Sequence, residues 1–266
     1  MDLIKYRASP LEKLRTADLL NLVPPSGRTA LDIGARDGHF SVLLAQRFEK
    51  VIALDLTQPA IQHPRVDCVQ GNAAQLNFPD KSIDFVFCAE VLEHIPSPVL
   101  PIVCQEIRRV AKQQILIGVP YKQDTRVGRT TCYSCMRTNP PWGHVNTFDE
   151  HAIFDLFPGT VVDSISFVGT NSEWTNALST ALMDLAGNPY GTYLQDEPCI
   201  HCGQRLSPPP ERTFAKKVLT KLAYWTRNAT AMVAKPRGNW IHLLLSKNGD
   251  GQPSQAAHLI QAAGLR

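Results

Sequence analysis

The stretch from Thr29 to Phe40, TALDIGARDGHF, constrains the fold of this chain more than any other. A short apolar run leads into a turn that contains Gly34 and Gly38, and apolar residues at helical spacing follow it. Strand, glycine turn and helix in this order are typical of the opening of an α/β ligand site. The glycines let the backbone approach a ligand, and the helix directs its N-terminal N–H groups toward that ligand.

Apolar runs and helical patterns alternate along the rest of the chain. The pattern predicts strands at 29–33, 51–54, 66–69, 83–88, 114–119, 160–168 and 240–246. It predicts helices at 9–22, 38–48, 97–110, 148–157 and 213–233. Most of these strands are continuously apolar, which indicates a parallel sheet covered on both faces. The predicted fold class is therefore α/β, with right-handed crossovers.

Composition excludes a disordered chain. Of the 266 residues, 44% are apolar and 19% are charged, as in globular proteins. The first fifteen residues are charged throughout, and no apolar run reaches the length of a membrane span. From these observations we expect a cytoplasmic protein.

Charge is distributed unevenly, although the formal net charge is only +3. Residues 205–237 hold eight basic residues and one acid, and residues 144–204 hold eight acids and no Lys or Arg. A third block, 121–143, has four basic residues and one acid. Such blocks suit an anionic partner, and an ordinary solvated surface is an equally good interpretation of any single cluster.

Polar side chains follow three predicted strands at the points where the strands end. Asp32 and the glycine turn follow the first strand, Asp55 follows the second, and Asn72 and Ala73 follow the third. A carboxylate at the second position can accept two hydrogen bonds from a ribose diol, and an amide can address an adenine edge. Because ligands of open parallel sheets bind at the carboxyl ends of the strands, these residues predict an adenosine-binding cleft.

The glycine turn indicates which kind of adenosine ligand fits. Arg36 stands where a dinucleotide fingerprint needs its second glycine. Asp32, two residues before the first glycine, would repel a pyrophosphate and suits a cationic ligand that carries an amine and a sulfonium.

At this point the chain resembles the class I S-adenosylmethionine-dependent methyltransferases of the type 11 family. The resemblance covers about residues 14–168 and rests on the stretches LDIGARDGHFS, VIALDL, VQGNAAQLNFPDKSIDFVFCAEVLEHIP, EIRRVAKQQILIGVP and GHVNTF. It implies a Rossmann-like, mostly parallel seven-stranded sheet with an antiparallel last strand. Arg36, and Gln113-Gln114 in place of a Pro-Gly-Gly turn, depart from the family pattern without removing a group that cofactor binding requires.

The resemblance assigns cofactor contacts residue by residue. Asp32, Gly34 and Gly38 would line the methionine side of S-adenosylmethionine, and Ala89 and Glu90 would contact its methionine portion. Asp55 would hold the ribose, Leu56 would pack on the adenine, and Asn72 and Ala73 would address the adenine edge.

Histidines are the candidate bases for a hydroxyl acceptor. His144 is the first candidate catalytic residue, and His94 is the second. A hydrogen-bonded structural histidine is the more common alternative for either position.

Four of the seven cysteines form two CxxC pairs, Cys132/Cys135 and Cys199/Cys202. In a cytosolic chain such pairs predict a structural four-cysteine zinc site, because four thiolates leave no open coordination position. His201 could replace a thiolate, and a redox pair or buried thiols are the alternatives. Both pairs follow strands of the same direction, so we expect the zinc to pin a cap over the carboxyl ends of the strands.

These predictions divide the chain into a core and a cap. The cofactor-binding core comprises 1–120, continues through a helix and strand at 144–168, and ends with the last strand at 239–248. The zinc cap comprises 121–143 and 169–238, and 249–266 is a peripheral tail. Within the cap, an apolar stripe formed by Phe214, Val218, Leu222, Trp225 and Met232 could contact a membrane, and packing against the cap is the favoured interpretation.

The predicted function is methyl transfer from S-adenosylmethionine to a small-molecule, glycan or lipid-linked acceptor, with an anionic acceptor and an oxygen atom preferred. One alternative is an RNA methyltransferase that uses the basic cap. The other is a zinc-stabilised binding or scaffold protein with a vestigial cleft.

Overall fold

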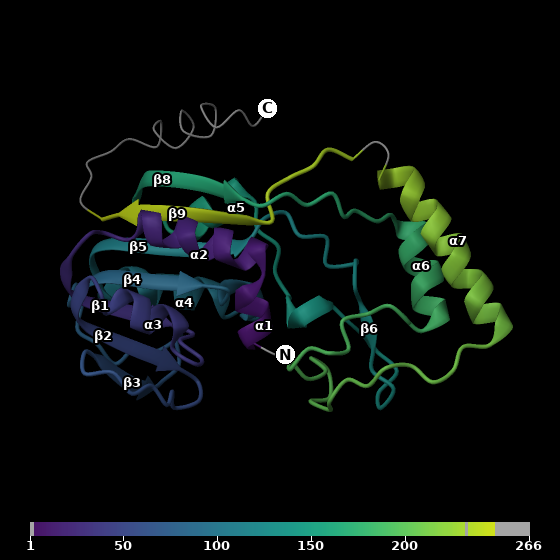
Figure 1. Cartoon of the computed structure of the whole chain (residues 1–266), viewed down its shortest axis with the longest axis horizontal. Coiled ribbons are helices and arrows are strands. Elements are labelled where there is room, and N and C mark those ends of the chain that lie inside the picture. The colour runs from purple at the N-terminus through teal and green to yellow at the C-terminus, as the bar shows by residue number, and fades with distance from the viewer. Residues whose placement is uncertain (1–2, 232–233, 248–266) are drawn as a thin grey trace. The chain divides into compact units, whose positions relative to one another are not determined.

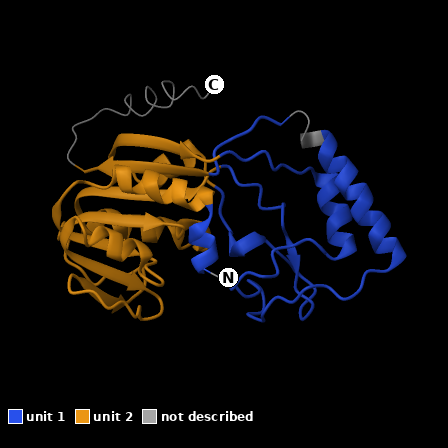
Figure 2. Ribbon diagram, viewed as in Figure 1, with its two compact units in different colours: residues 1–9, 122–147, 170–239 blue, residues 10–121, 148–169, 240–266 orange. Residues whose placement is uncertain are grey.

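The computed structural model describes residues 3–231 and 234–247. The chain divides into two units (Figure 2). Unit 1 comprises Met1–Ser9, Lys122–Thr147 and Thr170–Asn239, and unit 2 comprises Pro10–Tyr121, Phe148–Gly169 and Trp240–Arg266. Residues 144–147 thus group with the segment that contains the first cysteine pair. The predicted tail at 249–266 lies outside the described residues.

Unit 2 is built on a seven-stranded sheet with the order β3-β2-β1-β4-β5-β9-β8 (Figure 1). Its strands are β1 (Gly27–Ile33), β2 (Phe48–Asp55), β3 (Val66–Gln70), β4 (Ile83–Ala89), β5 (Ala111–Pro120), β8 (Val161–Val168) and β9 (Trp240–Ser246). The first five strands pair in parallel, and β9 is antiparallel to both β5 and β8. The predicted α/β fold with an antiparallel last strand is confirmed.

Helices cover both faces of this sheet. They are α2 (Pro10–Leu22), α3 (His39–Leu44), α4 (Leu100–Val110), α5 (Glu150–Leu156) and the 3-10 helix η1 (Leu92–His94). Successive residues of β1 face opposite sides, because side chains alternate along a strand. Ala30 lies in a buried cluster with Leu19 of α2 and Leu44 of α3, and Leu31 lies in another with Ile107 of α4. This double burial explains the continuously apolar strands.

Two predicted helix boundaries were wrong. The helix after the glycine turn ends at Leu44, and Phe48, which was assigned to it, begins β2. Phe48 is buried, and its ring stacks on Phe85 at a centroid distance of 5.3 Å. An apolar residue at helical spacing therefore belongs to the sheet core, which periodicity alone could not distinguish. The helix predicted from residue 97 begins at Leu100.

Unit 1 holds short elements and one helix pair. The elements are α1 (Leu3–Ala8), β6 (Thr130–Thr131), β7 (Thr138–Asn139), the 3-10 helix η2 (Pro141–Gly143), α6 (Ala177–Ala186) and α7 (Phe214–Ala231). Helix α6 was not predicted from the sequence, although Asn176 caps its start and Gly187 ends it with a φ of +85°. The Ser179 hydroxyl donates to the Ala223 carbonyl at 2.7 Å, which ties α6 to α7.

Helix α7 packs against α6, as the favoured interpretation expects, but its apolar stripe faces solvent. Phe214 and Trp225 are 83% and 58% exposed, and Val218 and Leu222 are also exposed. The small Ala223 is buried instead, beside the Ser179 contact with α6. Met232, the last predicted member of the stripe, lies outside the described residues.

Within residues 3–231 and 234–247, none of the helices is both long enough and apolar enough to span a bilayer.

A buried polar contact joins three elements of unit 2 and generates a stability prediction. The Asp18 carboxylate of α2 accepts from the Ser166 hydroxyl of β8 at 2.5 Å and contacts His242 Nδ1 of β9 at 2.6 Å. His242 is fully buried, so removing the carboxylate leaves an unsatisfied ring nitrogen in the core. We expect Asp18→Ala to lower the free energy of unfolding by about 2 kcal/mol, measured by urea denaturation at pH 7.

Asp67 provides the matched control, because it forms an exposed ion pair with Lys50. Exposed pairs contribute little, so Asp67→Ala should leave the denaturation midpoint nearly unchanged. Equal losses in the two variants would contradict the structural importance of the Asp18 contact.

Candidate functional site

The glycine turn connects β1 to α3 at the carboxyl end of the sheet. Gly34 and Gly38 have φ angles of +77° and +84°, which favour glycine. The Gly34 N–H donates to the Leu54 carbonyl of β2 at 2.8 Å. A Cβ at Gly34 would collide with Val91, and one at Gly38 would collide with Ile61. Conformation and space therefore both require glycine at these two positions.

Asp55 ends β2 and is oriented by two backbone donors. The Arg36 N–H donates to one carboxylate oxygen at 2.9 Å, and the Thr57 N–H donates to the other at 3.3 Å. Arg36 itself has a φ of +49°, a conformation that costs a non-glycine residue about 1 kcal/mol. The departure from glycine at this position therefore leaves the turn intact, at some strain.

Leu56, which follows Asp55, is 69% exposed. An exposed apolar side chain beside an oriented carboxylate can cover one face of a flat ring while the carboxylate accepts from hydroxyl groups. This pair is the part of the cleft with the clearest binding chemistry.

Asp32 is a buried carboxyl group of the cleft. It is only 2% exposed, at the end of β1, and the Ser41 hydroxyl of α3 donates to it at 2.5 Å. Burial raises the pKa of Asp32 to about 7, and the neighbouring charge of Asp55 adds to the effect, against the hydrogen bond from Ser41. A nearby cation would favour its ionised form.

Asn72 and Ala73 follow β3, as predicted. The Asn72 side-chain oxygen accepts from the Ala74 N–H at 2.9 Å, and Ala73 is buried. Asn72 therefore shapes its own loop, and its side-chain oxygen is already engaged in that turn.

Ala89 and Glu90 lie at the end of β4, which neighbours β1 in the sheet. Glu90 has a φ of +58°, and its N–H donates to the Gly118 carbonyl of β5 at 2.9 Å. Burial raises the pKa of the Glu90 carboxyl, against the attraction of Arg15, whose Nη1 lies 3.7 Å from Glu90 Oε1. Strand order thus brings Asp32, Asp55 and Glu90 to one edge of the sheet.

Three residues near the cleft were not predicted from the sequence, namely Glu12, Arg15 and Ser41. Arg15 donates to Glu12 through two nitrogens at 2.7 and 2.6 Å, and both side chains are buried. The guanidinium lies 5.7 Å from the Phe40 ring centroid and 5.5 Å from that of Trp240. A Glu and an Arg three positions apart on a helix resemble an ordinary surface pair, so only the fold reveals this buried one.

The two candidate bases lie in different units. His94 ends η1 in unit 2. His144 belongs to unit 1, where it is buried and its Nδ1 lies 2.6 Å from Gln123 Oε1. This contact fixes the orientation of the imidazole ring, and the catalytic role of His144 stays a prediction.

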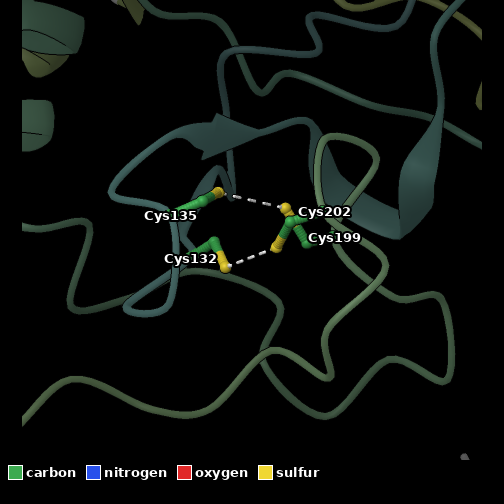
Figure 3. A group of neighbouring side chains, drawn as sticks. All are labelled: Cys132, Cys135, Cys199 and Cys202. Atoms are coloured by element: carbon green, nitrogen blue, oxygen red, sulfur yellow. Dashed lines mark hydrogen bonds between the residues drawn. The ribbon is translucent and has the colours of Figure 1, made fainter.

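The four predicted metal ligands converge in unit 1. Cys132, Cys135, Cys199 and Cys202 come from two loops and point toward one another (Figure 3). Their four sulfur atoms lie within 4.8 Å of one another. Two of the S–S distances are 3.7 Å, close to the distance of about 3.8 Å between ligands of a tetrahedral zinc–thiolate centre. A disulfide would need sulfurs separated by about 2 Å.

The two cysteine loops have the same backbone hydrogen bonds. The Cys132 N–H donates to the Arg137 carbonyl at 2.8 Å and the Met136 N–H to the Cys132 carbonyl at 2.7 Å. The second loop repeats both bonds, from Cys199 to Gln204 and from Gly203 to Cys199, each at 2.9 Å. Met136 and Gly203 also share a left-handed conformation. Such matched loops fit a tetrahedral ion held by both pairs.

His201 does not belong to this cluster. Its Nε2 lies 3.1 Å from the Thr138 carbonyl, and the group of possible ligands consists of the four cysteines. The donor set therefore fits zinc with four thiolates, and the replacement of a thiolate by His201 is not favoured.

Part of the chain matches a known protein family. Residues 31–117 match the family described as a methyltransferase domain. This stretch begins in β1 and ends in β5, so it contains the predicted cofactor residues from Asp32 to Glu90.

Two curated relatives match this chain over short lengths. A bifunctional biotin biosynthesis protein, BioHC of Cellvibrio japonicus, is 38% identical over 38% of this chain and 22% of its own length. A protein of Mycolicibacterium smegmatis named as a probable S-adenosylmethionine-dependent methyltransferase is 37% identical over 26% of this chain and 29% of its own length. The chain therefore spans less than a third of either relative.

A solved structure shares the fold more completely. The crystal structure of a protein proposed to be a methyltransferase, from Bacillus halodurans, covers 88% of this chain and 98% of its own, with a TM-score of 0.53 and 17% identity. At this level of identity, the likeness shows that the two chains share a fold.

The raised pKa of Asp32 generates a prediction about stability and pH. Because the folded-state pKa of about 7 lies above the ordinary value of 3.8, the folded state binds this proton more tightly than the unfolded state. The stabilisation of the folded state by this protonated carboxyl group is complete below about pH 4 and is lost as the pH rises through about 7. Relative to the wild type without cofactor, Asp32→Asn should therefore gain up to about 4 kcal/mol of stability between pH 4 and pH 8.

Urea unfolding at intervals of one pH unit measures this gain, and Asp67→Asn serves as the exposed control. Parallel pH profiles for the wild type and Asp32→Asn would show that the buried carboxyl group titrates normally.

Proposed function

We propose that this protein transfers the methyl group of S-adenosylmethionine to a small-molecule, glycan or lipid-linked acceptor, preferably on an oxygen atom. The observation that carries the proposal is the oriented Asp55 carboxylate beside the exposed Leu56, one strand away from the buried Asp32. The match of residues 31–117 to a methyltransferase domain supports the same conclusion.

The residues of the cleft fit this cofactor. Asp55 would accept hydrogen bonds from the ribose hydroxyls, Leu56 would cover the adenine, and Asn72 and Ala73 would lie at its edge. Asp32, Gly34, Gly38, Ala89 and Glu90 would surround the methionine part. Bound S-adenosylmethionine supplies a methyl group activated by a positively charged sulfur. Carboxyl groups at adjacent strand ends can pair with such a cation. Burial raises the pKa of Asp32, and a bound cation would favour its ionised form.

For the reaction, the protein would align the acceptor and exclude water. A hydroxyl acceptor also benefits from a base, and we propose His144 for this role because Gln123 holds its ring in one orientation. His94 is the second candidate.

A lipid-linked or anionic acceptor is supported by α7. Its exposed apolar stripe runs beside Lys217 and Lys221, a combination that suits contact with an anionic lipid surface. The RNA alternative relies on the same basic residues, and a steep loss of RNA binding with salt would favour it. The scaffold alternative requires that S-adenosylmethionine produce no heat above buffer in calorimetry.

The four-cysteine cluster is proposed to hold one structural zinc ion. Besides the sulfur geometry, the small size of the neighbouring core supports this role. Around the cysteines, the buried apolar cluster of the described residues comprises Cys132, Tyr193, Cys199 and Leu206, with Tyr133 and Cys135 partly buried against it. So small a cluster supplies little hydrophobic stabilisation, and a metal ion would compensate for it.

Asp55→Ala tests the cofactor site and the reaction together. Loss of two charge-assisted hydrogen bonds should weaken binding of S-adenosylmethionine about 100-fold, measured by calorimetry. The same variant should abolish methyl incorporation in a screen that offers glycans, lipid-linked sugars and RNA side by side. Asp67→Ala, at an exposed position of β3, should match the wild type in both assays, and near-wild-type affinity of Asp55→Ala would refute the ribose assignment.

Metal analysis tests the zinc centre. We expect about one zinc per chain, and Cys199→Ser should reduce this content to a small fraction and lower the thermal stability of unit 1. Cys68→Ser, which changes a cysteine of β3, should retain the metal. A wild-type protein purified without chelators that contains no zinc would contradict the proposed centre.

A further inference from the structure

A cavity of about 640 Å³ lies wholly within unit 1. Its wall is formed by α6, α7, the loop at 126–129 and the loop at 188–191. A volume of this size is typical of sites for small organic ligands. Because every wall residue belongs to unit 1, the cavity is a property of that unit alone.

The wall of this cavity is strongly cationic. Its six basic residues are Arg126, Arg129, Arg212, Lys217, Lys221 and Arg227. None of its wall residues among those that the structure describes is an Asp or Glu. Three of the arginines form ion pairs with acids outside the wall, namely Arg126 with Asp124, Arg129 with Asp184, and Arg227 with Glu173. The other three basic residues of the wall are Arg212, Lys217 and Lys221.

Arg212 is held in place by neutral groups. Its Nη1 donates to the Tyr190 hydroxyl at 2.9 Å, and its guanidinium lies 5.0 Å from the Tyr190 ring centroid. The same Nη1 lies 3.4 Å from Thr220 Oγ1. These contacts orient the guanidinium without neutralising it, which is the arrangement expected of a residue that pairs with an incoming anion.

Lys217 and Lys221 are one helical turn apart on α7, so their side chains emerge on the same face. Lys221 Nζ lies 5.2 Å from the Trp225 ring centroid. In the part of the chain that the structure describes, no carboxylate forms an ion pair with Arg212, Lys217 or Lys221. Like charges gathered in a concave wall repel one another and concentrate a positive potential that attracts anions.

The same wall offers an apolar surface and a fixed frame. Val127, Met183 and Tyr224 contribute apolar groups to it. The two helices are joined by the Ser179 bond to α7 and by a bond from Asn176 Nδ2 to the Thr226 carbonyl at 2.8 Å. Because these bonds hold the helices together, the cationic groups are organised before any ligand arrives, which lowers the entropic cost of binding.

We propose that this cavity binds a phosphate or diphosphate ester. The phosphate oxygens would pair with Arg212, Lys217 and Lys221, and the organic part would lie against Met183 and Tyr224. Three cations without carboxylate partners match the charge of a diphosphate better than that of a single carboxylate. The site depends only on residues of unit 1, so it can hold or fail independently of methyl transfer in unit 2.

Calorimetry on the full, zinc-loaded chain tests the site with inorganic pyrophosphate and UDP-glucose. We expect both to bind the wild type, and the double variant Lys217→Ala/Lys221→Ala to bind them at least 10-fold more weakly, because two charged contacts are lost. Lys216→Ala is the matched control, since Lys216 lies on the same helix but does not line the cavity. It should retain wild-type affinity.

Vesicles of phosphatidylcholine with phosphatidic acid distinguish a lipid headgroup from a soluble ester. Vesicle binding that is lost in the double variant but kept by Lys216→Ala supports the site with a lipid as the source of phosphate, even if the soluble probes bind weakly. Equal losses in Lys216→Ala and the double variant would overturn the site in favour of diffuse charge attraction. So would binding of an RNA oligonucleotide without binding of any of the phosphate esters.

Circular dichroism shows whether each variant keeps the fold of the wild type. Lys216 is partly exposed and Lys217 and Lys221 are exposed, so their removal should leave the helical signal and the thermal midpoint unchanged. Wild-type protein that shows no heat with pyrophosphate, UDP-glucose and vesicles alike would refute the proposal.

Discussion

The cleft of unit 2 depends on the hydrogen bond between the Arg36 N–H and the Asp55 carboxylate. This bond joins the turn after β1 to the end of β2, and it forms only because Gly34 and Gly38 let the chain reverse in so little space. The same turn starts α3, from which Ser41 donates to Asp32. Backbone geometry thus fixes two carboxyl groups in different surroundings, one oriented and accessible, the other buried.

The different surroundings of the Asp55 and Asp32 carboxyl groups suit them to different parts of a ligand. Asp55 accepts from two N–H donors and keeps an exposed apolar neighbour in Leu56, which suits recognition of a nucleoside. Asp32 is buried, which raises its pKa, and a cation close by would favour the ionised form of its carboxyl group. A positively charged methyl donor with a ribose meets both requirements, whereas a pyrophosphate meets neither.

Unit 1 has short elements and only a small buried core near the cysteines. Its segments leave the sheet after β5 and after β8, and its elements near the cysteines are too short to bury a large core. Two loops with matching hydrogen bonds gather four thiolates, and the helix pair α6–α7 is tied by side-chain bonds to backbone carbonyls. The cationic cavity lies against this pair, so the frame that stabilises the helices also positions the charges.

Much of this organisation could be predicted from the residues. Continuous apolar strands predicted the sheet, and polar strand ends predicted that Asp32 and Asp55 lie at the carboxyl ends of its strands. The place of Glu90 in this site was implied by the family resemblance. Spacing alone could not show that Phe48 belongs to the sheet or that Arg15 and Glu12 are buried. It also misplaced the stripe of α7, since helical periodicity identifies an apolar face without showing what covers it.

We propose that the carboxyl ends of β1, β2 and β4 hold S-adenosylmethionine through Asp55 and Leu56. In a crystal structure of the protein with S-adenosylhomocysteine, we expect the two ribose hydroxyls to lie on the Asp55 carboxylate and the adenine to lie against Leu56. Binding of the nucleoside elsewhere, or a cleft that stays closed by side chains at saturating ligand, would contradict it.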